Sequence, residues 1–65
     1  MDDSTKDMVE EAYRETVQEA LTRGDASQKA HEEGVVAAAM LLSAMNGVED
    51  EAAKQQVVGL GLKPE

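Results

Sequence analysis

The chain has 65 residues, 14 of them acidic and 6 basic, with a formal net charge of −8, no cysteine, no Phe or Trp, and a single Tyr. A chain of this length buries only about 60% of its unfolded surface, and without cysteine it has no disulfide to compensate, so oligomerisation or folding onto a partner is the expected support. The acidic charge repels the phosphate groups of nucleic acids and of anionic membranes. We therefore expect the chain to bind neither of them directly.

The first predicted helix covers residues 4–23. Ser4 is a candidate N-cap, with Asp7 three positions further on, and Gly24 offers the left-handed conformation that ends many helices. The apolar positions fall on one stripe of the helical wheel, which predicts an ordinary amphipathic helix. They are Val9, Ala12, Tyr13, Val17, Ala20 and Leu21.

The second predicted helix covers residues 26–45. Asp25 and Gln28 have the spacing of a capping box, and Asn46-Gly47 is a strong stop signal. Small residues recur every fourth position, a spacing that lets another helix approach closely. They are Ala30, Gly34 and Ala38.

From Val35 to Met45 the second helix has one polar residue, Ser43, and therefore no polar face. A helix that is apolar all round must be buried all round. As a helix this run spans about 17 Å, against about 30 Å of bilayer hydrocarbon, so it is too short to cross a membrane. The side expected to pack on the first helix carries Val35, Ala38, Leu42 and Met45, and the opposite side carries Val36, Ala37, Met40 and Ala44.

The third predicted helix covers residues 49–58 and begins with three acidic residues, as the helix dipole favours. Gly59 followed by Leu60 resembles a helix end at which an apolar residue folds back. The tail, residues 61–65, is expected to be loosely held, with Leu62 docking. The possible inner face is thin: Val48, Ala52, Ala53, Val57 and Leu60.

These patterns predict an all-α fold in one domain, residues 1–65: a helical hairpin plus a short third helix. Because the first and third helices cannot cover both sides of the second, we expect a homodimer or larger helical assembly, or binding to another protein. The residues predicted to form that interface are Val36, Met40, Ala44, Gly34, Ala37 and His31.

No pattern of catalytic or metal-binding residues stands out. His31 is the only histidine, and position 35, where a zinc-binding helix would need its second histidine, is Val35. Ser4, Ser27 and Ser43 have no base at a plausible spacing, and the carboxylates lie mostly at helix ends. We therefore expect no enzyme activity, no metal and no cofactor.

The function predicted from the sequence is that of a small acidic, non-catalytic interaction or regulatory protein, with the second helix as its oligomer or partner interface. An acidic inhibitor that mimics nucleic acid and occupies a basic surface of a target enzyme, as some phage or antitoxin proteins do, is the alternative. A small subunit of an enzyme complex is a remote third. The start, MDDSTKD, lacks the features of a signal peptide, and a cytoplasmic location is the expectation.

Overall fold

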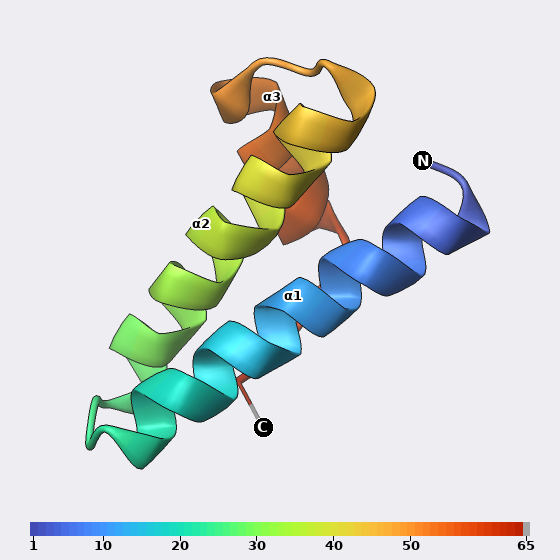
Figure 1. The fold of residues 1–65 in the computed structure, drawn as a ribbon. Helices are drawn as coiled ribbons and strands as arrows, with labels where there is room; N and C mark the ends of the chain where they lie inside the picture. Colours follow the sequence, from blue (N-terminus) through green and yellow to red (C-terminus); the bar gives the residue numbers. More distant parts are fainter. Residues whose placement is uncertain (65) are drawn as a thin grey trace.

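The computed structural model describes residues 1–64, which form three α-helices and, within that range, no strand (Figure 1). The helices are α1 (Asp3–Thr22), α2 (Ser27–Asn46) and α3 (Asp50–Gly59). This confirms the predicted all-α fold of three helices. Each helix lies one residue away from its predicted range, α1 toward the N-terminus and the other two toward the C-terminus.

Asp2, and not Ser4, caps the start of α1. The Thr5 N–H donates to Asp2 Oδ1 over 2.8 Å, and this hydrogen bond lowers the pKa of the Asp2 carboxyl. Ser4 lies inside the first turn, so the predicted cap was wrong. Asp and Ser cap helices about equally well, which is why a start with both residues leaves the choice open.

A tight turn at Gly24 ends α1, as the sequence predicted. Gly24 has φ 99°, its N–H donates to the Leu21 carbonyl, and the Asp25 N–H donates to the Ala20 carbonyl, both over 3.0 Å. This pair of hydrogen bonds is the Schellman motif, which satisfies the last carbonyls of a helix and reverses the chain.

The start of α2 differs from the prediction, and its end agrees with it. Ala26 occupies the N-cap position with no side-chain hydrogen bond, so the predicted capping box at Asp25 is absent. At the other end Gly47, with φ 68°, stops the helix as predicted. Ser43, the polar residue in the apolar run, donates its hydroxyl to the Val48 carbonyl over 2.6 Å and so ties the end of α2 to the segment leading into α3.

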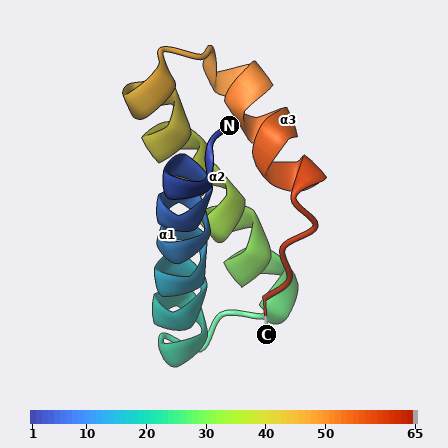
Figure 2. The ribbon, with the colours of Figure 1, turned by 90° about the vertical axis from the view of Figure 1, so that its right-hand side faces the viewer.

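In the spatial arrangement α2 is the central helix, and it packs against both α1 and α3 (Figure 2). The segment after α3 runs back toward the turn between α1 and α2. Leu62 in this segment packs against the core, as predicted; Glu65 lies outside the described residues. The buried apolar residues are Val9, Tyr13, Val17, Ala20, Ala30, Val35, Ala38, Ala39, Leu42, Ala53 and Val57.

Two expectations about the core were wrong. Met45 is 40% exposed at the end of α2 and does not join the packing on α1. Ala52 is exposed, and the inward positions of α3 are Ala53 and Val57. The left-handed residue after α3 is Gly61, with φ 71°, while Gly59 is the last residue of the helix.

The closest approach of α1 and α2 occurs at Gly34. A Cβ placed there would lie 2.7 Å from Val17 Cγ2 and 2.8 Å from Tyr13 Cδ1, closer than carbon atoms can pack. Ala30 and Ala38, one turn away on either side, are fully buried. The helix that the small-residue spacing anticipated is therefore α1 of the same chain.

Replacing Gly34 with Ala should destabilise the fold. The added methyl overpacks the crossing, which costs about 1–3 kcal/mol and outweighs the gain of about 1 kcal/mol in helix propensity. Urea unfolding followed by far-UV circular dichroism measures the change. Gly59→Ala is the matched control, because nothing lies within 4 Å of a Cβ at Gly59. Equal stabilities for the two variants would contradict the close crossing.

Candidate functional site

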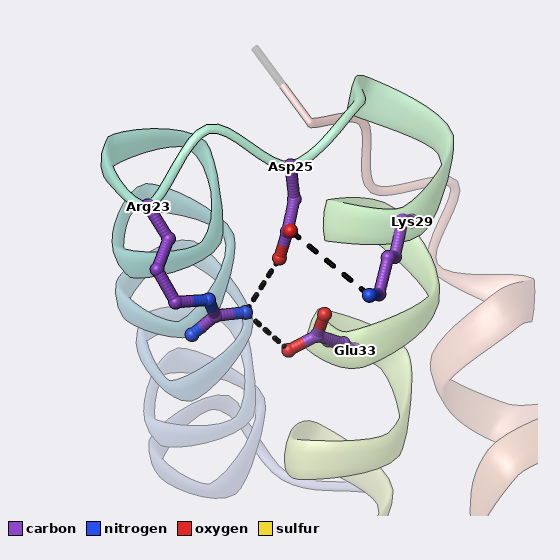
Figure 3. A network of polar contacts seen from close by, with 4 residues as sticks. All are labelled: Arg23, Asp25, Lys29 and Glu33. Carbon is purple, nitrogen blue, oxygen red and sulfur yellow. Dashed lines mark hydrogen bonds and ion pairs between the residues drawn. The ribbon is translucent and has the colours of Figure 1, made fainter.

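A polar network joins the end of α1 to the start of α2 (Figure 3). Arg23 Nη2 donates to Asp25 Oδ2 over 2.6 Å and to Glu33 Oε1 over 2.8 Å. Lys29 Nζ lies 4.0 Å from Asp25 Oδ1. The Arg23 guanidinium lowers the pKa of the Asp25 carboxyl and explains why Asp25 does not cap α2. The charges satisfy one another, so the network positions the two helices and offers no free group for chemistry.

His31 is held by Tyr13 from the neighbouring helix. The Tyr13 hydroxyl lies 2.6 Å from His31 Nδ1, and the two rings pack edge to face, with centroids 5.6 Å apart and planes at 74°. Tyr13 is 1% exposed, and this burial raises the pKa of its hydroxyl. A protonated tyrosine donates to His31 whenever Nδ1 carries no proton, so the pair is a link between α1 and α2.

The six predicted interface residues do not share one surface. His31 is half-buried and lines a depression together with Val36 and Val58. Val36, Met40 and Ala44 are exposed on the side of α2 that faces away from the core, and Ala37 beside them is half-buried. Gly34 is not on that surface, because it is buried under Tyr13 and Val17.

The exposed side of α2 carries Met40, the most exposed large apolar residue of the described chain. Met40 is 64% exposed and Val36 46%, and Val58 of α3, at 60%, lines the same depression as Val36. We call these three residues the Met40 patch. A shallow depression between α1 and α2 reaches from Thr16 to Met40, and another lies between Met40 and the first turns of α3.

The exposure of Val58 was not predicted from the sequence. Two valines stand side by side in α3, Val57 and Val58, and adjacent residues of a helix point about 100° apart. Only one of them can reach the core, and it is Val57, at 1% exposure. The pairing of two large apolar residues on a ten-residue helix was therefore a signal that one would remain at the surface.

Carboxylates border the Met40 patch on both sides. The depressions around it are lined by four acidic residues and one lysine, Lys54. Of the four, Glu33 is paired with Arg23, and the ion pairs found within residues 1–64 include no partner for the other three. We call these four carboxylates the acidic rim: Glu32, Glu33, Asp50 and Glu51.

A separate depression of about 560 Å³ lies on the opposite flank of α1. The segment after α3 forms one wall through Leu62, Lys63 and Pro64, and Tyr13 and Leu21 are among the residues of the other wall.

In the part of the chain that the structure describes, no three His, Asp or Glu side chains are grouped so as to hold a metal ion. No helix there is long and apolar enough to cross a membrane.

Comparisons of the chain with protein-family models, with curated proteins and with solved structures found no match. The function is therefore argued from the chain's own residues.

The Asp25 carboxyl should make the stability of the chain depend on pH in acidic solution. Its pKa is lowered from 3.8 in the folded chain, so its contribution is complete above that pH and is lost as the pH falls through the lower, folded value. Stability curves against pH for the wild type and Asp25→Asn should run parallel above about pH 5 and converge in more acidic solution.

Arg23→Gln is the control, since the guanidinium is the main cause of the lowered pKa. In that background, Asp25→Asn should give a difference that changes much less with pH, because only the smaller effects of Lys29 and Glu33 then lower the pKa of the Asp25 carboxyl. A pH-dependent difference that is undiminished by Arg23→Gln would assign the effect to another group.

Proposed function

We propose that the chain is a small acidic interaction protein, with no catalysis of its own, and that the Met40 patch is the surface through which it binds another polypeptide. The observation that carries the proposal is the exposure of Met40, at 64%, on the central helix of the fold. A scattered exposed apolar residue is normal on any protein, but three large ones along adjacent depressions form a continuous patch.

The energetics support covering this patch. Full burial of a Val or Met side chain is worth about 1.5–3 kcal/mol. The three residues of the patch are each roughly half exposed or more, so covering them recovers about 2.5–5 kcal/mol. Small domains have total stabilities of about 5 kcal/mol, so this is a large fraction. Methionine is also well suited to binding surfaces because its flexible, polarizable side chain adapts to different partners.

A second copy of the chain is the simplest occupant, because twofold homodimers are the commonest oligomers. Two copies also bring two acidic rims together, and this repulsion weakens as salt screens it. Self-association through the patch is thus expected to be weak at low salt and stronger at high salt. A cytoplasmic location is part of the same proposal, since the absence of cysteine suits a reducing compartment.

One observation favours the alternative, an acidic inhibitor that occupies a basic surface. Four carboxylates stand at four-residue spacing on α1, all exposed, and form a row of about 18 Å along its outer side. A contact made by such a row weakens as salt rises, the reverse of the trend expected for the Met40 patch. The row consists of Asp7, Glu11, Glu15 and Glu19.

Sedimentation mass at low and high salt tests the proposal. The wild type should remain helical and self-associate more at high salt, whereas Met40→Glu should remain a helical monomer at both. Because Met40 is exposed, its replacement should change the stability of a single chain by no more than about 0.5 kcal/mol.

Met45→Glu is the matched control, with the same substitution on the same helix at a residue outside the patch. It should behave like the wild type. An oligomer that survives Met40→Glu, or a wild type that dissociates on adding salt, would contradict the proposal. A wild type that stays monomeric throughout would exclude a second copy as the occupant of the patch.

A further inference from the structure

The chemistry around the Met40 patch selects among polypeptides that could cover it. The patch itself is uncharged, but its border is the acidic rim, four carboxylates against the single ammonium group of Lys54. An occupant that covers the patch must lie against both surfaces. It therefore needs apolar side chains at its centre and positive charges at its edges.

A second copy of the chain meets only half of this requirement. In a parallel packing of two α2 helices, Glu32 would face its own counterpart. In an antiparallel packing centred on Met40, Glu32 would face the partner's Val48, two residues before the acidic start of α3. The parallel arrangement places carboxylates against carboxylates, and the antiparallel one brings Glu32 near the acidic start of the partner's α3. Like charges brought close together oppose association.

We infer that the Met40 patch and the acidic rim together form a docking surface for a basic amphipathic helix of another protein. This inference rests on the proposed function and adds the chemistry of the partner. An amphipathic helix lays its apolar stripe on a hydrophobic surface, and Lys or Arg beside the stripe reach flanking carboxylates. Depressions on both sides of Met40, one toward Thr16 and one toward the start of α3, can accept the side chains of such a stripe.

The charges available at the rim suit this partner. Glu32 borders the depressions on both sides of Val36, and Asp50 and Glu51 border the one between α2 and α3. Glu33 is already bonded to Arg23, which leaves three carboxylates for the occupant. Charge-assisted contacts at the edge of an apolar centre favour one partner over others and speed association.

The test uses a synthetic amphipathic peptide with a leucine stripe, flanking lysines and arginines, and one tryptophan within the stripe. Because the chain contains no tryptophan, the tryptophan emission of the complex reports on the peptide alone. Docking on the patch should shift that emission to shorter wavelength, as burial in an apolar surface does, and adsorption to charge alone should not. A peptide of the same stripe with glutamates at its flanks should not bind.

Matched variants separate the patch from the general negative charge of the chain. Met40→Glu should abolish the emission shift although it adds a negative charge, and Met45→Glu should preserve it. Glu32→Gln with Glu51→Gln should weaken binding about tenfold, whereas Glu11→Gln with Glu15→Gln, an equal change in charge on the outer side of α1, should weaken it by less than about threefold. Circular dichroism verifies that each variant is folded.

Three results would overturn the inference: a peptide that binds without an emission shift, equal weakening by the two glutamine pairs, or no binding. If the peptide fails in one of these ways while Met40→Glu still abolishes self-association, the proposed function stands and the inference alone is wrong. If Met40→Glu changes neither peptide binding nor self-association, both are wrong.

Discussion

The close crossing of α1 and α2 at Gly34 is the constraint on which the arrangement of this chain depends. Tyr13 and Val17 occupy the space where any larger residue would place its Cβ, so α2 can present only its small-residue side to α1. Val36 lies about 160° around the helix from Gly34, and Met40 lies about 120° from it in the same direction. Fixing Gly34 against α1 therefore turns both residues away from it. The link between Tyr13 and His31 and the network around Arg23 fasten the same two helices.

The third helix decides how much of α2 remains uncovered. It has ten residues, and its buried positions are Ala53 and Val57. So short an inner face covers Val35 and Ala39, both 5% exposed, but it leaves Val36 and Met40 at the surface. Val58 adds to the exposed apolar area, and the acidic start of α3 supplies half of the rim. The same helix thus completes the core and borders the surface proposed for binding.

Most of the fold could be predicted from the helical periodicity of apolar residues and from the residues that end helices. Gly24 and Gly47 end their helices because both adopt positive φ, and the wheel of α2 correctly placed Val36 and Met40 away from α1; their role as an interface stays a prediction. The choice among similar groups could not be predicted. Asp25 can cap α2, but Arg23 and its hydrogen bonds compete for the carboxylate. A line of small residues predicts that another helix packs closely, but it does not show whether that helix belongs to the same chain or to a partner. For this reason Gly34 was wrongly assigned to the interface.

The most direct measurement of whether the Met40 patch is covered uses the methionines of the chain as reporters. Met40 is 64% exposed in the single chain, against 47% for Met8, so peroxide should oxidise Met40 faster when the purified chain is dilute. Mass spectrometry of the chain oxidised inside its native cells gives the comparison. The account predicts that the order reverses there, with Met40 protected relative to Met8. Faster oxidation of Met40 in both settings would show a bare patch and contradict the account.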